Sequence, residues 1–205
     1  MVSLSYAVTA CNEHVELKRL LDQLVKNKRE VDEIVVQVDY ETVTERVMDV
    51  LSSYSNDIAS IIKFPLNKDF ATFKNSLKSK CSKDWILFID ADEYLSDELI
   101  ECLPGILILN NGLDLIWLPR VNTVEGLTEE DITRWGWRVD EHGRVNYPDL
   151  QSRLCKNIAD IKWEGKVHER LVGAKTFAAL PEGFDLIHEK TIERQRQQNN
   201  FYNTL

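Results

Sequence analysis

Residues 84–93 read Asp-Trp-Ile-Leu-Phe-Ile-Asp-Ala-Asp-Glu, with an unbroken apolar run from Trp85 to Ile89. This run has the length of one β-strand and is far shorter than the roughly 20 residues that a membrane-spanning helix needs. Because no polar residue interrupts it, we expect a central strand that is covered on both faces, as strands of parallel sheets are. The strand is followed by two carboxylates, Asp90 and Asp92, that stand one residue apart.

Outward from this strand, the first half of the chain alternates strand-length apolar runs with helical periodicity. Further strands are predicted at residues 4–9, 33–38 and 58–64. The alternation is typical of βαβ units, so we predict an α/β fold with a mostly parallel sheet and helices on both faces. The intervening helices are marked by the stripe Leu17, Leu20, Leu21 and Leu24, by the capping-box spacing of Thr42 and Glu45, and by a basic helix at 69–81 that buries Phe70, Phe73 and Leu77.

The alternation stops after residue 95, and the second half is irregular. We expect one domain over residues 1–205, made of a regular half at 1–95, a smaller irregular half at 96–190 and a polar tail or frayed helix at 191–205. The elements predicted in the irregular half are a short helix from Ser96 to about Pro104-Gly105, a strand at 113–121, a helix from Thr128 through Trp135, and loops and short strands over 145–156 and 161–172.

The composition narrows the classes of function. The chain has 25 basic and 34 acidic side chains among 205 residues, a net charge of -9, which disfavours a general nucleic-acid binder. A run of lysines between Lys63 and Lys83 is either the solvated face of a helix or an anion-attracting surface. The four cysteines are scattered, without a Cys-x-x-Cys pair, so we expect reduced thiols. No basic amino-terminal region precedes an apolar run, and we expect a cytoplasmic location.

Polar residues follow the predicted parallel strands where each strand ends. The first strand runs into Thr9-Ala-Cys-Asn-Glu13, the second into Asp39 and the central one into Asp90-Ala-Asp92. Ligands of open α/β sheets bind at the carboxyl ends of the strands, and converging carboxylates are costly unless a cation uses them. Oxygen ligands of this kind select Mg²⁺ or Mn²⁺, which bind phosphate oxygens in turn. The alternative for Asp90 and Asp92 is an ordinary strand-to-turn cap.

At this point the chain resembles the family-2 glycosyltransferases over roughly residues 4–170. The resemblance rests on Thr9-Ala-Cys-Asn-Glu13, Lys74-Asn75, the Asp-x-Asp strand end, and two later segments, Tyr147-Pro-Asp-Leu-Gln-Ser-Arg-Leu154 and Trp163-Glu-Gly-Lys-Val-His-Glu169. It implies a GT-A-like fold, in which residues 1–95 bind a nucleotide-sugar and residues 96–190 face the acceptor. The implied activity is metal-dependent, inverting transfer of a sugar from a nucleoside-diphosphate donor, UDP-linked by expectation, to an acceptor hydroxyl.

The resemblance also implies roles for individual residues. Glu169 would be the catalytic base, Asp92 the direct metal ligand for Mn²⁺ or Mg²⁺, and His188 a further ligand, with His168 as its competitor. The chain departs from the common family pattern at Cys11, where an aromatic residue often packs on the base, and after Asp39, which is followed by Tyr-Glu-Thr-Val-Thr-Glu. The nucleotide-sugar would be bound by Thr9, Ala10, Cys11, Glu13, Asp39, Lys74, Asn75, Asp90 and Ala91.

Other interpretations remain open from the residues. Tryptophans of the irregular half can stack on a sugar ring or form a core; we favour core for Trp163 and leave Trp135 and Trp137 open. A haloacid-dehalogenase phosphatase or a nucleotidyltransferase would share the carboxylate-bearing strand end but not the surrounding motifs. The alternative from another class is a catalytically inactive sugar- or partner-binding module. The acceptor can be a glycan, a lipid-linked sugar, a protein or a modified nucleic-acid base, and the oligomeric state is not predicted.

Overall fold

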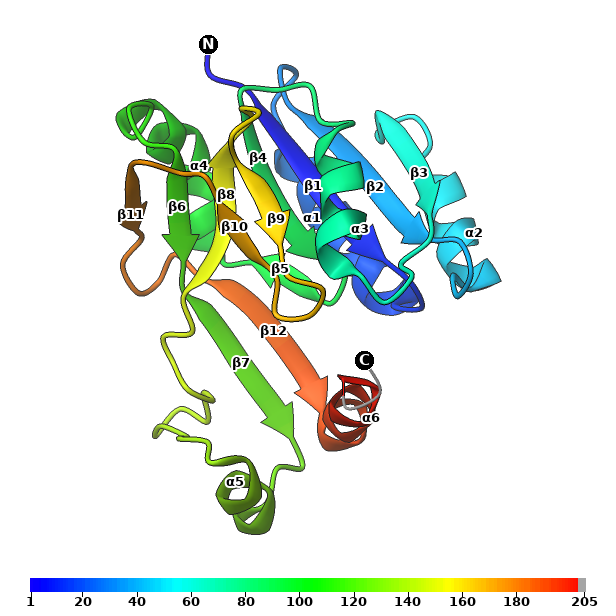
Figure 1. The fold of residues 1–205 in the computed structure, drawn as a ribbon, viewed down its shortest axis with the longest axis vertical. Helices are drawn as coiled ribbons and strands as arrows, with labels where there is room; N and C mark the ends of the chain where they lie inside the picture. The colour runs from blue at the N-terminus through cyan, green and yellow to red at the C-terminus, as the bar shows by residue number, and fades with distance from the viewer. Residues whose placement is uncertain (203–205) are drawn as a thin grey trace.

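A central sheet organises the molecule, as the ribbon of the computed structural model shows (Figure 1). The structure describes residues 1–202, with side chains described through residue 200, so the last part of the predicted tail, residues 203–205, lies outside the described residues. Within that part of the chain the sheet has seven strands in the order β11-β6-β8-β4-β1-β2-β3. Their bounds are β1 Leu4–Ala10, β2 Glu33–Asp39, β3 Ser60–Phe64, β4 Trp85–Asp90, β6 Leu115–Leu118, β8 Gln151–Lys156 and β11 Phe177–Ala179.

The sheet is mostly parallel, as predicted. Strand β1 pairs in parallel with β2 and β4, and β2 pairs in parallel with β3. Strand β8 is the exception, because it lies antiparallel between β4 and β6. The side chains of Trp85, Ile86, Leu87, Phe88 and Ile89 in β4 are almost completely buried, which confirms the central, doubly covered strand.

Helices cover both faces of the sheet, which confirms the predicted fold class. One face carries α1 (His14–Asn27), α2 (Glu45–Ser53) and α4 (Asp97–Leu109), whose apolar stripes join one core cluster with β1, β2 and β4. The other face carries α3 (Phe70–Lys78) and the hairpin of β9 (Lys162–Glu164) and β10 (Arg170–Val172) (Figure 1). Trp163 is buried there edge-on to the Phe88 ring, with 5.1 Å between ring centroids, so it is a core residue as favoured.

A second, three-stranded sheet extends from the carboxyl edge of the first (Figure 1). In it β12 (Leu186–Thr191) lies between β5 (Glu93–Leu95) and β7 (Arg120–Glu125). Helix α5 (Glu129–Trp135) follows β7, and α6 (Ile192–Tyr202) follows β12. The predicted polar segment at 191–205 thus forms a helix over most of its length. All four cysteines are free thiols.

Three local predictions are wrong, each because tertiary contacts override a sequence signal. Thr42 does not cap α2: the helix begins after Thr44, and the Thr42 hydroxyl donates to Asp39 instead. Helix α4 does not end near Pro104-Gly105 but continues to Leu109, because Ile106 and Leu107 complete its buried face. The single strand predicted at 113–121 is split at Pro119 into β6 and β7, which belong to different sheets. No helix of the described residues is long and apolar enough to span a membrane.

The hairpin that carries Glu169 depends on one glycine. Gly173 follows β10 with φ +89°, and a Cβ there would lie 1.9 Å from the Asp160 carbonyl oxygen. Gly183 has a similar φ of +97°, but a Cβ at this position would have no other atom within 4 Å. Gly183 is therefore a matched control for the effect of φ alone.

We predict that Gly173→Ala lowers the free energy of unfolding by roughly 2 kcal/mol more than Gly183→Ala. Both variants carry the positive-φ cost of about 1–2 kcal/mol, and only the first adds a backbone clash. Urea unfolding of the two variants measures the difference. Equal destabilisation would show that the Asp160–Gly173 contact is not a constraint on the hairpin.

Candidate active site

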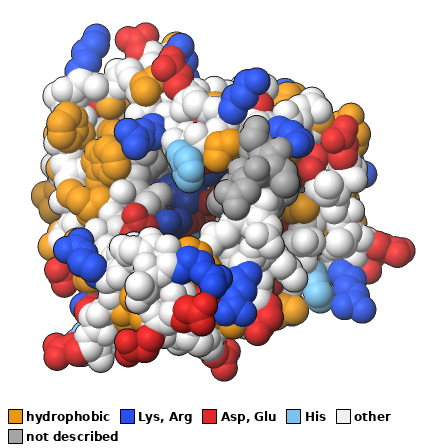
Figure 2. Space-filling model, turned by 60° about the horizontal axis from the view of Figure 1, so that its bottom comes forward, with side chains coloured by type: hydrophobic (Ala, Val, Ile, Leu, Met, Phe, Trp, Pro, Cys, Tyr) orange, Lys and Arg blue, Asp and Glu red, His pale blue; other side chains and the backbone are white. Residues whose placement is uncertain are grey.

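A cavity of about 780 Å³ lies at the carboxyl ends of β1, β2 and β4, between the two sheets. In the space-filling view it is a hollow with basic and acidic side chains inside (Figure 2). Strand β7 and helix α6 contribute the opposite wall. Of the residues that the resemblance implies, the cavity is lined by Thr9, Ala10, Cys11, Glu13, Asp39, Lys74, Asp90, Ala91, Asp92, Glu169 and His188.

Asn75 is the exception. Its amide nitrogen donates to the Trp163 carbonyl at 2.8 Å, and its amide oxygen accepts from the Trp163 backbone N–H at 2.9 Å. Asn75 is absent from the cavity lining. Both ends of its side chain therefore attach α3 to β9, and the structure does not bring it to the other predicted nucleotide-binding residues.

Asp39 and Glu13 organise the loops at one end of the cavity. The Asp39 carboxylate accepts from the Thr42 hydroxyl at 2.6 Å and from the Leu66 backbone N–H at 3.1 Å. The Glu13 carboxylate accepts from the backbone N–H groups of Cys11 at 2.9 Å and Asn12 at 3.0 Å. These bonds fold the segments after β1 and β2 around the cavity, so both carboxylates shape the site through the backbone.

Asp90 is surrounded by partners that keep it ionised. Its carboxylate accepts from the Thr9 hydroxyl at 2.7 Å and from Arg153 Nη2 at 2.6 Å, and Lys74 Nζ lies 3.4 Å away. Burial alone would raise the pKa of Asp90, but the charges of Arg153 and Lys74 hold it well below its usual range. Such a carboxylate anchors cations and hydroxyls, and it is a poor proton acceptor.

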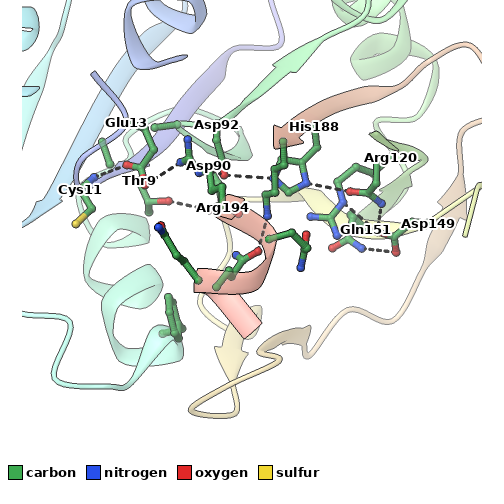
Figure 3. Close-up of a pocket in the computed structure, with 18 of the residues that line it drawn as sticks. Thr9, Cys11, Glu13, Asp90, Asp92, Arg120, Asp149, Gln151, His188 and Arg194 are labelled. Atoms are coloured by element: carbon green, nitrogen blue, oxygen red, sulfur yellow. Dashed lines mark hydrogen bonds and ion pairs between the residues drawn. The ribbon is translucent and has the colours of Figure 1, made fainter. Parts of the chain in front are cut away.

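Asp92 points away from Asp90 and toward the second sheet (Figure 3). Its Oδ2 lies 3.2 Å from His188 Nε2 and 3.5 Å from Arg194 Nη2. Burial alone would raise the pKa of Asp92, but the hydrogen bond with His188 and the charges of His188 and Lys190 lower it. The result is an ionised carboxylate beside an imidazole at the edge of the cavity.

Strand pairing explains why His188 meets Asp92 although 95 residues separate them in the chain. In β12, His188 stands opposite Glu93 of β5 and Asn122 of β7. Its Nδ1 lies 2.9 Å from the Asn122 side-chain oxygen, which fixes the orientation of the ring. Because β5 starts directly after Asp92, this register places the second ring nitrogen of His188 against the Asp92 carboxylate.

Glu169 lies in the turn between β9 and β10. Its Oε1 is 2.7 Å from Lys74 Nζ, and its side chain is only 14% exposed. The preceding His168 has φ +55°, a left-handed conformation that is uncommon outside glycine and asparagine and is often found at functional sites. Lys74 therefore connects Glu169 with Asp90, and the turn is held in a strained shape that directs Glu169 into the cavity.

Several site residues are missing from the sequence-based prediction. Arg153 is 4% exposed and pairs with Asp90 and, at 3.0 Å, with Glu93. Arg120 binds the same Glu93 at 3.0 Å and also binds Asp149 at 2.6 Å. Arg153 lies within the Tyr147–Leu154 segment that the resemblance had marked, so a signal for it was present.

Arg194 had no such signal. It lies in the polar, glutamine-rich α6, yet its guanidinium reaches Asp92, and it also pairs with Glu13 at 3.3 Å and with Glu16. Figure 3 shows the resulting row of polar contacts, from Cys11 past Arg194 and His188 to Asp149. Helix α6 is thus part of the cavity wall.

Solved structures with the same fold support this description. The crystal structure of S. aureus TarS 1-349 has a TM-score of 0.63 at 13% identity, covering 92% of this chain and 60% of that one. Its complex with UDP-GlcNAc has a TM-score of 0.64 at 14% identity, covering 93% of this chain and 59% of that one. The chain thus spans less than two thirds of the length of these TarS chains, and the likeness confirms the GT-A-like α/β fold class.

No curated protein matches this chain. A family model does: the one described as Glycosyl transferase family 2 matches residues 5–158, more than half of the sequence. The match includes the Asp90-Ala-Asp92 strand end and Arg153. As the sequence motifs implied, the protein belongs to glycosyl transferase family 2.

Proposed function

We propose that this protein transfers a sugar from a nucleoside-diphosphate donor, UDP-linked, to an acceptor hydroxyl, with divalent metal and with inversion at the anomeric carbon. The observation that carries the proposal is one cavity in which Asp90 and Asp92 lie at the end of β4, His188 faces Asp92 from β12, and Glu169 lines the same space. Family membership and the fold shared with a UDP-GlcNAc complex of TarS support a nucleotide-sugar donor.

The donor would lie along the cavity from the β1 and β2 ends toward β12. Thr9, Cys11 and Asp39 are at the end formed by the two loops, which suits the nucleoside. Lys190 and Arg194 are at the other end, and the positive charges of both act on Asp92. This end suits the diphosphate. Two cationic side chains near the departing phosphates would stabilise the charge that grows there.

Asp92 and His188 fit a divalent ion. One carboxylate oxygen and one imidazole nitrogen face each other at 3.2 Å, and Mg²⁺ or Mn²⁺ bound by few protein groups takes its remaining ligands from substrate phosphates and water. Among the described residues no group of three or more His, Cys, Asp or Glu gathers for a metal, so the substrate would complete the site. When bound, the ion would neutralise charge on the leaving diphosphate.

Glu169 would accept the proton of the acceptor hydroxyl as that oxygen attacks the anomeric carbon. Inversion requires the attacking oxygen and the leaving phosphate on opposite faces of the sugar, with a base on the acceptor side. Lys74 holds Glu169 at 2.7 Å and stands 3.4 Å from Asp90, so it would fix the distance between the base and the donor end of the site.

The role of Glu169 is tested with Glu169→Gln. We expect UDP binding to be retained and the release of UDP from UDP-GlcNAc to fall by roughly 10²- to 10⁴-fold, because the proton acceptor is lost. The control is Glu164→Gln, since Glu164 lies in the same hairpin, is 56% exposed and pairs only at the surface with Lys162. Turnover of Glu169→Gln at the level of this control would remove Glu169 from the mechanism.

The metal role of Asp92 is tested by thermal unfolding with UDP, with and without Mn²⁺. At a UDP concentration about 100 times the Kd, Mn²⁺-dependent binding would raise Tm by roughly 5–10 °C in the native protein. We expect Asp92→Asn to lose the Mn²⁺-dependent part of this shift, whereas Asp160→Asn, at a carboxylate that is 70% exposed, keeps it. Binding of UDP that is independent of metal in the native protein would contradict the metal-dependent mechanism.

A further inference from the structure

A second cavity of about 430 Å³ meets the first one at Glu169. Four residues line both cavities: Arg120, Gln151, His168 and Glu169. The carboxylate that would take the acceptor proton therefore stands at the junction of the two spaces. We propose that the second cavity is the acceptor site and that it binds an acidic saccharide, a pyranose with a carboxylate or phosphate group. That this sugar is the acceptor rests on the proposed function, whereas the binding of an acidic sugar in the cavity does not.

The position of the cavity argues for an acceptor. The predicted nucleotide-binding residues other than Asn75, and both predicted metal ligands, line only the first cavity, so a donor there would leave the second one open. A molecule in the second cavity would reach Glu169 from the side of Trp117 and Leu150. Its volume falls in the range of roughly 300–1,000 Å³ that is usual for small-molecule sites.

The lining suits a sugar better than a lipid chain. Only Trp117 and Leu150 are apolar side chains in it, and the rest of the wall is polar or charged. Trp117, a residue of β6, is only partly buried against the core, which leaves part of the indole for the apolar face of a pyranose. Gln151 and Ser152 offer hydrogen-bonding groups at the start of β8. The Gln151 amide nitrogen already donates to Asp149 at 2.7 Å, and an alkyl chain would offer no partner to the remaining polar atoms.

The charge of the lining indicates an acidic ligand. Glu169 is balanced by Lys74, and Arg120 by Glu93 and Asp149. Arg170 is exposed and, within the part of the chain that the structure describes, makes no ion pair. Its cross-strand neighbour Glu164 pairs with Lys162 instead. Arg170 thus adds an unbalanced positive charge to a protein of net charge -9, and a carboxylate or phosphate would match its guanidinium fork.

The test compares methyl glucuronide with methyl glucoside by saturation-transfer NMR on the full chain. We expect the native protein to bind the glucuronide more tightly than the glucoside, Arg170→Gln to weaken glucuronide binding about tenfold, and glucoside binding to stay unchanged. The control is Arg134→Gln in α5, at an arginine that is 60% exposed and lines neither cavity. Equal binding of the two sugars, or equal effects of the two variants, would overturn the acidic class.

A second variant tests the cavity itself. Leu150 is 43% exposed at the wall, and Leu150→Trp should fill the space and abolish glucuronide binding while the UDP-induced rise in Tm is kept. UDP and the glucuronide should also bind together; displacement of the sugar by UDP would show a single shared site and refute the proposal. If the native protein does not bind UDP, the proposed function is contradicted. The comparison of the two sugars would still decide whether the second cavity binds an acidic sugar.

Discussion

The ion pairs of Arg153 hold the site together. Arg153 belongs to β8, which lies between β4 and β6 and runs antiparallel to both. Its guanidinium binds Asp90 at 2.6 Å and Glu93 at 3.0 Å. Glu93 is completely buried and also binds Arg120, at the start of β7, so one carboxylate joins the two sheets. Removing one partner from a buried pair of this kind costs about 3–5 kcal/mol, because a charge is left unpaired. With Asp90 and Glu93 both bound, Asp92 is the carboxylate of this turn that faces His188.

Charge balance in the first cavity follows from this arrangement. Asp90 has two cations, Glu169 has Lys74, and Asp92 has the imidazole of His188 and the more distant Arg194. The partners of Asp90 and Glu169 come from elements packed on the central sheet, whereas Arg194 comes from α6, whose exposed, polar sequence gives it little core of its own. Among these partners Arg194 is therefore the least firmly held by core packing.

The first half of the fold could be predicted from sequence because its signals are local. The apolar run 85–89 and the leucine stripe of α1 each determine one element by periodicity. Local signals failed where burial at a distance decides: Ile106 and Leu107 carry α4 past Pro104. The predicted carboxylates meet because parallel strands end at one edge, but the Arg153 pairs depend on β8 entering between β4 and β6, and Arg194 depends on α6 folding back. The motif that contains Arg153 does not show which carboxylates this residue pairs with, and Arg194 has no motif around it.

The position of Glu169 depends on the core between α3 and the central strand β4. Its hairpin is attached to α3 by the double hydrogen bond between Asn75 and Trp163, and the Trp163 indole packs on Phe88 of the central strand. Lys74, the neighbour of Asn75, then reaches Glu169 from the same helix. None of these contacts involves the segment from β7 through α5 to residue 150. Within that segment, Trp135, Trp137 and Leu150 can therefore change without loss of a contact that holds Glu169. Under the proposed function, acceptor preference would then vary while the position of the base stays the same.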